Sequence, residues 1–291
     1  GKLMPESVKL FEPLNIRGCR LPNRIVVSPL CQYSAVDGFA QPWHFAHLST
    51  FARGKAGLVF TEATAVEERG RITPRCLGIW TDAQAEALRP TIEVIESMGC
   101  VPGMQLAHAG RKASTRVPFV EKGGSPLTAE DAARGESPWQ SVAPSAVAVT
   151  EGWPVPRELT PDDLAEIKEA FVAATRRALA IGIKVIELHM AHGYLLHSFL
   201  SPLANQRSDE FGGDIEGRMR FPLEVATAVR AAMPKDAPLF VRISAVDGRQ
   251  GGWTLEDSVV LCRQMAQIGV DVVDCSSGGI GGAPRFRCDD G

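Results

Sequence analysis

The sequence predicts an α/β fold in which parallel strands alternate with helices, and three observations support this. Three segments share one order of signals: a Thr that can cap a helix, a polar partner three residues later, an amphipathic stretch, a Gly and an apolar run. The apolar runs are short and rich in β-branched residues, which is typical of strands buried on both faces. With 291 residues, 45% of them apolar, the chain is long enough to bury a full core.

Six strands and five helices are expected in order along the chain. The predicted strands cover residues 25–30, 58–63, 101–106, 183–189, 239–244 and 270–276. The predicted helices cover residues 44–55, 81–99, 160–182, 217–233 and 254–269. Alternation of this kind implies a parallel sheet with right-handed crossovers. The strands begin roughly 50 residues apart, a spacing that fits a (β/α)8 barrel with loop insertions. We therefore expect about six of the eight units of such a barrel, in a single domain over residues 1–291.

The largest insertion covers residues 110–158 and is rich in Pro, Gly, Ser and Trp. It follows the third strand, on the side where such barrels keep their chemistry, so we expect a lid or subdomain. A linker to a second domain is the alternative, but the alternation of strands and helices resumes beyond it.

Composition excludes several classes of function. A formal net charge of −3 without basic runs argues against a nucleic-acid surface, which needs clustered Lys and Arg. No apolar run approaches the roughly 20 residues that span a bilayer, and the first residues lack a signal-peptide core, so a cytoplasmic protein is expected. The seven cysteines include no Cys-x-x-Cys pair, which favours reduced thiols over a zinc or iron–sulfur site.

Polar side chains follow the predicted strands at the points where the strands end. Carboxyl ends of parallel strands face the active site in such folds, so one cleft could gather these residues. The candidates by strand are residues 28–33, 61–63, 105–108 and 187–194, and Arg242.

His189 and His192 form a His-x-x-His pattern with three interpretations. Zinc hydrolases usually place two histidines four residues apart on a helix beside a Glu, whereas here the first His ends a strand and no third ligand is evident. A purely structural pair is a second possibility. We favour two imidazoles, neutral or protonated, that donate hydrogen bonds to one carbonyl or phenolate oxygen and stabilise the charge that develops there.

Other candidates also have plainer interpretations. The only two tyrosines, Tyr33 and Tyr194, both follow strand ends, where a Tyr often only fills space. Cys31 lies in an apolar run without an adjacent base, which is usual for an unreactive buried thiol. Arg242 lies inside an apolar strand and needs an anionic partner, which a salt bridge to Glu187 or Asp274 would also provide.

With these residues assembled, the chain resembles the Old Yellow Enzyme family, in its bacterial thermophilic-like and xenobiotic-reductase subclass. The resemblance runs from residue 10 to about residue 282. Its most specific motifs are SPLCQY at 28–33, QLAHAGRK at 105–112 and the block from residue 187 to 213. It implies an FMN-dependent ene-reductase that uses NADPH or NADH to reduce α,β-unsaturated carbonyl compounds through flavin N5.

The resemblance also implies roles for individual residues. Those expected to line FMN are Ser28, Pro29, Leu30, Cys31, Ala63, Gln105 and Arg242. A fixed guanidinium suits reduced flavin, which carries negative charge near N1 and C2=O. His189 and His192 would bind the substrate carbonyl with help from Tyr33, and Tyr194 would donate a proton to the α-carbon. The expected partners are small electrophiles, with no metal, membrane or nucleic acid, and the sequence leaves open whether the chain forms a homo-oligomer.

The pattern departs from the family at its end. Strands seven and eight, where such barrels commonly hold the phosphate, have no counterpart here. The glycine cluster at 278–282 is a weak phosphate signal and fits a turn better. The sequence thus leaves two further hypotheses beside the reductase: a non-catalytic truncated homologue that acts as a binding protein, and a metal-dependent barrel hydrolase.

Overall fold

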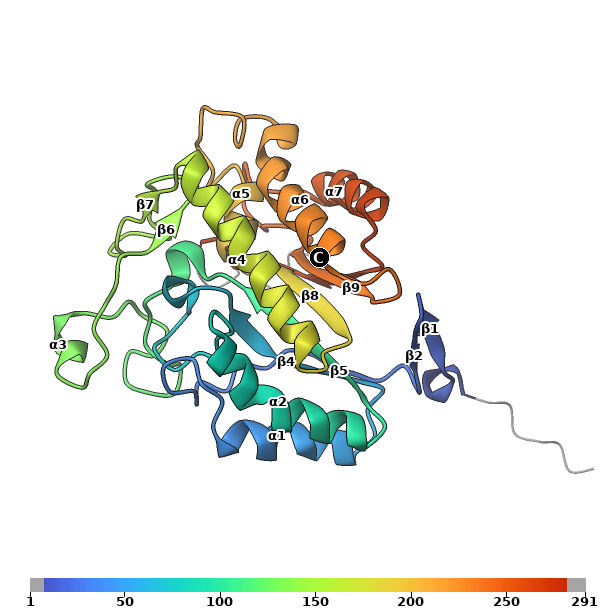
Figure 1. Ribbon diagram of the computed structural model, residues 1–291. Helices are drawn as coiled ribbons and strands as arrows, with labels where there is room; N and C mark the ends of the chain where they lie inside the picture. Colours follow the sequence, from blue (N-terminus) through green and yellow to red (C-terminus); the bar gives the residue numbers. More distant parts are fainter. Residues whose placement is uncertain (1–7, 282–291) are drawn as a thin grey trace, which may run out of the picture.

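A parallel sheet of six strands forms the centre of the molecule in a computed structural model that describes residues 8–281. Its order is β10-β9-β8-β5-β4-β3, and it curls into a half-barrel (Figure 1). The strands are β3 (Val26–Val27), β4 (Leu58–Ala65), β5 (Val101–Ala107), β8 (Val185–Met190), β9 (Leu239–Ser244) and β10 (Val272–Ser276). The predicted strands and their parallel arrangement are confirmed, as six units of a (β/α)8 barrel.

Five helices cover the outer face of the sheet. They are α1 (Pro42–Arg53), α2 (Asp82–Ser97), α4 (Pro161–Ala180), α6 (Ile215–Ala232) and α7 (Leu255–Ile268). The hydroxyl oxygens of Thr81, Thr160 and Thr254 each accept the backbone N–H three residues later, so the predicted caps are present. Helix α6 begins two residues before the predicted start because Asp214 caps it through the amide of Gly217.

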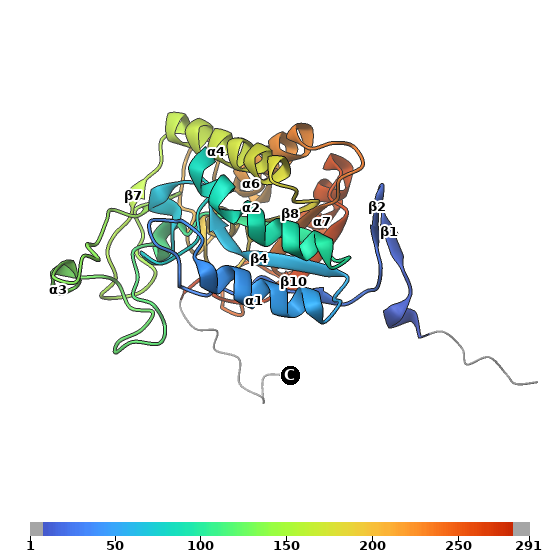
Figure 2. The ribbon, with the colours of Figure 1, turned by 60° about the horizontal axis from the view of Figure 1, so that its bottom comes forward.

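The segment between β5 and α4 lies beyond the carboxyl ends of the strands (Figures 1 and 2). It contains little regular structure: η3 (Gly110–Lys112), α3 (Ala129–Ala132), β6 (Val142–Ala143) and β7 (Arg157–Glu158). β6 and β7 form a short parallel pair. The insertion expected at residues 110–158 falls within this segment, and its role as a lid or subdomain stays a prediction.

An antiparallel hairpin that the sequence pattern did not predict lies at the opposite end of the sheet (Figure 2). It follows η1 (Lys9–Phe11) and consists of β1 (Leu14–Ile16) and β2 (Cys19–Leu21). Arg17 Nε donates to Asp271 Oδ1 over 2.7 Å, and Gly18 N donates to Asp236 O over 3.1 Å. These contacts hold the hairpin against the amino ends of the strands.

Side chains of the strands alternate between two environments, as the strand period of two requires. Outward residues such as Ile186 and Val241 belong to the main core under the helices. Inward residues near the amino ends form a second apolar cluster of Leu21, Leu58, Phe60, Val185 and Phe240. Further along β5, β8, β9 and β10 the inward residues are polar, so the inner face has an apolar end and a polar end.

Burial differs between central and edge strands. All residues of β4 and β8 are buried, whereas β10 is mostly half-buried and β3 has an exposed residue. The expectation of burial on both faces is therefore wrong for β3 and β10, because each pairs with a neighbour along one edge only within residues 8–281. Gly278 and Gly279 have φ of +69° and +97°, which fits the predicted turn. Ile280 and Gly281 continue the turn, and Gly282, the last residue of the predicted glycine cluster, lies outside the described residues.

Candidate active site

Three aromatic rings meet where β8 ends. The centroid of the His189 ring lies 5.0 Å from those of His192 and Tyr194, and the rings are nearly perpendicular. The backbone permits this because His192 and Gly193 both adopt left-handed conformations, with φ of +61° and +77°, and turn the chain sharply. Tyr194 is then the N-cap residue of α5 (Leu195–Leu200). The structure thus brings together the three residues that the sequence predicted as a group.

Both histidines are neutral at neutral pH. Burial lowers the pKa of His189 well below its usual range, and His192 and Arg242 lower it further. Burial and then Arg242 lower the pKa of His192 to about 4. The sequence left neutral and protonated imidazoles open, and the environment selects the neutral form.

The hydrogen bonds constrain where each neutral ring carries its proton. Ala191 N donates to His189 Nδ1 over 3.2 Å, so the proton of His189 is on Nε2, which can donate to a ligand. His192 Nε2 lies 2.5 Å from Ser276 Oγ. With Ser276 as the donor, the proton of His192 is on Nδ1, which gives a second N–H for the same ligand.

The two tyrosines and Cys31 are held in their protonated forms. Burial is the largest cause in each case, and it raises the pKa of Cys31, Tyr33 and Tyr194. Cys31 contributes to the raised pKa of Tyr33, and Cys31 and Tyr33 both contribute to the raised pKa of Tyr194, so the loop after β3 and the loop after β8 lie close together. A protonated, buried thiol is a poor nucleophile, in agreement with the interpretation of Cys31 as unreactive.

Glu62 fixes the loop that carries Cys31 and Tyr33. Its carboxylate accepts from Gln32 N over 2.5 Å and lies 3.1 Å from His44 Nε2. His44 Nδ1 accepts from Gln41 N, so Nε2 carries the proton and donates to Glu62. Tyr33 itself has φ of +51° and its ring lies 6.4 Å from that of Phe119, in the segment after β5. Among the candidates at the end of β4, Glu62 therefore has a structural contact with the first loop.

A row of polar side chains crosses the inner face of the sheet below the three rings. Gln105 Nε2 donates to Glu187 Oε1 over 2.9 Å. Arg242 Nε lies 3.6 Å from Asp274 Oδ2, too far for a hydrogen bond. Burial, and then the charge of Asp274, raise the pKa of Glu187 to about 8. The salt bridge considered for Arg242 thus exists with Asp274, but it leaves the guanidinium incompletely satisfied.

The residues present fit a flavin. Arg242 Nε is buried and is one of the few side-chain polar atoms in the described part of the chain without a hydrogen-bond partner. A buried cationic donor without a partner suits an acceptor atom with negative charge, such as the pyrimidine end of a reduced flavin. Ala63 is buried on β4 beside Cys31. Ser28 and Leu30 are exposed and Pro29 is half-buried at the edge of the sheet after β3.

Lys112 is a site residue to which the sequence assigned no role. Its Nζ donates to His192 O over 2.7 Å and to Gly279 O over 2.9 Å, and it lies 5.2 Å from the centre of the Tyr194 ring. Burial, and then Arg111, lower its pKa to about 8. Lys112 thereby ties the loops after β5, β8 and β10 together. The sequence feature that could have identified Lys112 as a site residue is its position at the end of the QLAHAGRK motif, shortly after a strand.

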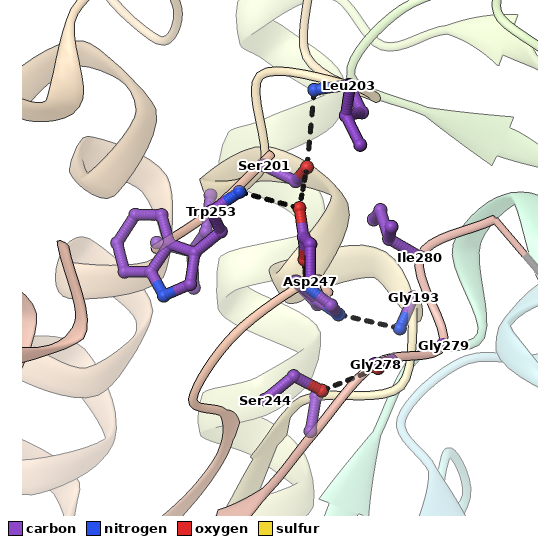
Figure 3. Close-up of polar contacts among 12 residues, drawn as sticks. Gly193, Ser201, Leu203, Ser244, Asp247, Trp253, Gly278, Gly279 and Ile280 are labelled. Atoms are coloured by element: carbon purple, nitrogen blue, oxygen red, sulfur yellow. Dashed lines mark hydrogen bonds and ion pairs between the residues drawn. The ribbon is translucent and has the colours of Figure 1, made fainter. Parts of the chain in front are cut away.

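Ser244 and Ser276 are two further residues that the sequence did not single out. His192 N donates to Ser244 Oγ over 2.9 Å, and Ser244 Oγ donates to Gly278 O over 2.8 Å (Figure 3). Both serines are the last residues of their strands. They support the backbone and the ring of His192 from the side of β9 and β10.

Residues 8–281 contain neither a candidate metal site nor a candidate membrane span. No group of three or more His, Cys, Asp or Glu residues there could hold a metal ion. None of the described helices has both the length and the apolar character needed to cross a membrane.

Comparisons with known proteins place the chain in a family. The profile of the NADH:flavin oxidoreductase / NADH oxidase family matches residues 9–283. An NADPH dehydrogenase of Geobacillus sp. (strain WCH70) is 43% identical over 273 residues, which are 93% of this chain and 73% of that protein.

Solved structures agree with this assignment. An Old Yellow Enzyme homologue from Zymomonas mobilis superimposes with a TM-score of 0.77 at 26% identity, covering 92% of this chain and 73% of that one. Morphinone reductase in complex with tetrahydroNAD superimposes with a TM-score of 0.77 at 27% identity, covering 92% of this chain and 74% of that one. The chain therefore belongs to the NADH:flavin oxidoreductase / NADH oxidase family, which includes Old Yellow Enzyme, and is an NAD(P)H-dependent flavin oxidoreductase.

Proposed function

We propose that the protein is an FMN-dependent ene-reductase that uses NADPH or NADH to reduce the C=C bond of small α,β-unsaturated carbonyl compounds. The observation that carries this proposal is the group of His189, His192 and Tyr194 at the end of β8. It offers two neutral N–H donors beside one buried phenol. The similarity to morphinone reductase in complex with tetrahydroNAD supports the use of a nicotinamide reductant.

The two histidines bind and polarise the substrate. The Nε2–H of His189 and the Nδ1–H of His192 donate to the carbonyl oxygen. Electron density then moves toward this oxygen and the β-carbon becomes electrophilic. Neutral imidazoles suit this role because they donate hydrogen bonds without transferring a full proton to the oxygen. Tyr33, on the loop held by Glu62, helps to orient the substrate.

Tyr194 supplies the proton that completes the reduction. Its buried hydroxyl stays protonated over the physiological pH range and can donate to the α-carbon. When bound, FMN would supply the hydride-transfer chemistry, with the nicotinamide as the source of the hydride and the substrate β-carbon as its acceptor. The net reaction adds one hydride and one proton across the C=C bond and oxidises the nicotinamide.

Residues on the inner face of the sheet would hold FMN. Arg242 and Gln105 would contact its pyrimidine end, where the unpartnered Arg242 Nε provides a donor. Ser28 to Cys31 would line one side of the ring system, with Cys31 and Ala63 near the N5 and O4 edge as influences on its redox potential.

The Tyr194→Phe variant tests this assignment. We expect the oxidative half-reaction with cyclohexenone to slow by about 10²- to 10⁴-fold, because general-acid catalysis by Tyr194 is lost. Flavin reduction by NADPH should stay within about twofold of wild type, since it needs no proton at the α-carbon. Stopped-flow absorbance of the holoenzyme measures both steps.

The matched control is Tyr33→Phe, which removes a phenol from the same cleft but not the proposed proton donor. We expect a weaker effect, mainly on KM. Equal slowing of both half-reactions in Tyr194→Phe would contradict the role of Tyr194. A wild-type holoenzyme that oxidises NADPH but reduces no enone would contradict the proposed function.

A further inference from the structure

A buried network lies behind the turn that carries His192 and Tyr194. Gly193, between them, donates its backbone N–H to His197 Nδ1 over 2.7 Å. Nδ1 is therefore an acceptor, and the ring proton is on Nε2. His197 Nε2 donates to Asp247 Oδ1, also over 2.7 Å, and both side chains are almost completely buried. A neutral imidazole thus connects one backbone amide to one carboxylate.

Asp247 is fixed from three directions. Besides His197, it accepts from Ser201 Oγ over 2.6 Å and from Trp253 N over 2.8 Å (Figure 3). Burial alone would raise the pKa of Asp247, but the hydrogen bonds from His197, from Ser201 and from the backbone of Trp253 outweigh it and lower the pKa. The acceptor behind His197 is therefore a carboxylate whose position is set by the loop between β9 and α7.

The turn needs such a support. His192 and Gly193 are both left-handed, with φ of +61° and +77°, a conformation that is strained for a non-glycine residue such as His192. The backbone groups of His192 and Gly193 make three hydrogen bonds to side chains: His192 N donates to Ser244, Lys112 Nζ donates to His192 O, and Gly193 N donates to His197. Of these three, only the bond from Gly193 to His197 is linked onward to a carboxylate, that of Asp247. Gly193 is also the residue between His192 and Tyr194, the two proposed catalytic residues.

We propose that His197 is a positioning residue that sets the ligand-binding geometry of His192 and Tyr194 through the amide of Gly193, with Asp247 fixing its tautomer. The inference rests on the proposed function of this site. His197 does not itself face the substrate, because both of its ring nitrogens are used by Gly193 and Asp247. Its influence passes through the backbone.

Two variants separate the two contacts of His197. In His197→Asn, the amide oxygen can take the place of Nδ1 and accept from Gly193, but the side chain is too short to reach Asp247. In His197→Gln, the terminal amide can take the place of Nε2 and donate to Asp247, but Gly193 loses its acceptor. Both variants remove the ring, so differences between them report on which contact matters.

The first measurement is the dissociation constant of p-hydroxybenzaldehyde, taken from the charge-transfer band of the holoenzyme. We expect about tenfold weaker binding in His197→Gln than in His197→Asn. Hydrogen exchange should also show less protection of the Gly193 amide in His197→Gln. In enone reduction, kcat should fall in His197→Gln, while thermal unfolding shows both variants folded.

The proposal would be overturned by equal phenol affinities in the two variants, or by stronger loss in His197→Asn. It would also be overturned by wild-type NMR spectra at pH 7 that show His197 with its proton on Nδ1 or as an imidazolium, because Gly193 would then have no acceptor. This readout needs no variant. Exchange and tautomer measurements also need no turnover, so a failure of the ene-reductase assignment is distinguished from a failure of this inference.

Discussion

The inner face of the sheet is apolar near the amino ends of the strands and polar near their carboxyl ends. The apolar end stabilises the fold, and the polar end forms part of the candidate site. Near the amino ends, Phe60 and Phe240 pack with a ring distance of 5.7 Å under the β1–β2 hairpin. Two residues after Val185 in β8 the inward side chain is Glu187, and two residues after Phe240 in β9 it is Arg242. Apolar contacts close one end, while at the other end Arg242 Nε is buried without a hydrogen-bond partner. In β8 and β9, the residues that stabilise the fold and the residues of the candidate site are therefore only two positions apart.

The strongest test of the apolar end is Phe60→Ala. We expect a loss of about 3–5 kcal/mol in the free energy of unfolding, because a large aromatic side chain is removed from a close-packed cluster. Denaturant unfolding followed by circular dichroism measures it. Val259→Ala, on the exposed side of α7, should change stability by less than about 0.5 kcal/mol. Similar effects of both substitutions would show that the cluster does not stabilise the fold.

At the polar end, Glu187→Gln should remove a pH dependence of stability. The pKa of Glu187 is raised from 4.5 to about 8, so the folded state binds more protons than the unfolded state between these values. The contribution of Glu187 to the free energy of unfolding is therefore largest below pH 4.5, and it is lost as the pH rises through 8. At about 1.4 kcal/mol per pKa unit, a rise of the pKa from 4.5 to about 8 corresponds to a loss of about 5 kcal/mol in wild type across this pH range.

Glu187→Gln keeps an acceptor for Gln105 and is neutral at every pH, so it is a close isostere. Its stability should change little between pH 5 and 9. Unfolding curves at intervals of one pH unit measure the difference. A variant that loses stability with rising pH as steeply as wild type would show that Glu187 is ionised in the folded protein at neutral pH.

The ring cluster at the end of β8 should have its main effect on ligand binding. Replacing His189 and His192 together with Ala should weaken binding of a phenol by about 10- to 100-fold, corresponding to two lost hydrogen bonds at about 0.5–1.5 kcal/mol each. The charge-transfer band of the holoenzyme reports the affinity. His47→Ala, on the outer helix α1, serves as the control and should bind the phenol as wild type does.

The smallest effect is expected at a helix end remote from both environments. Thr254→Ala removes the side-chain acceptor of the Asp257 amide and should cost about 1 kcal/mol. Thr227→Ala, an exposed position within α6, should have a smaller effect. Thermal unfolding compares the two. A larger loss at Thr227 would contradict the importance of the cap for α7.

Local signals predicted the repeating part of the fold. The Thr caps, the terminating glycines and the apolar runs depend on residues within a few positions of one another, and the structure confirms them. The β1–β2 hairpin could not be predicted in this way. Its strands have three residues each, and its anchor joins Arg17 to Asp271, which are 254 residues apart.

In the candidate site, too, features that depend on neighbouring residues were predicted from the sequence, and features that depend on distant residues were not. The sequence predicted that His189, His192 and Tyr194 lie together, because all three follow one strand. It could not fix their protonation, since the low pKa of His192 depends on burial and on Arg242 from another strand. Nor could it identify His197 as a neighbour of Asp247, because a helix and a strand separate them in the chain.

Two glycines on neighbouring loops leave no room for a side chain on either. A Cβ atom on Gly193 would lie 2.2 Å from Gly279 O, and one on Gly279 would lie 2.6 Å from His192 Cα. Their backbones are in direct contact, and both have positive φ. Anyone who redesigns this enzyme by exchanging loops with a relative must therefore transfer the turn after β8 and the turn after β10 as one unit, since neither shape is compatible with a foreign partner.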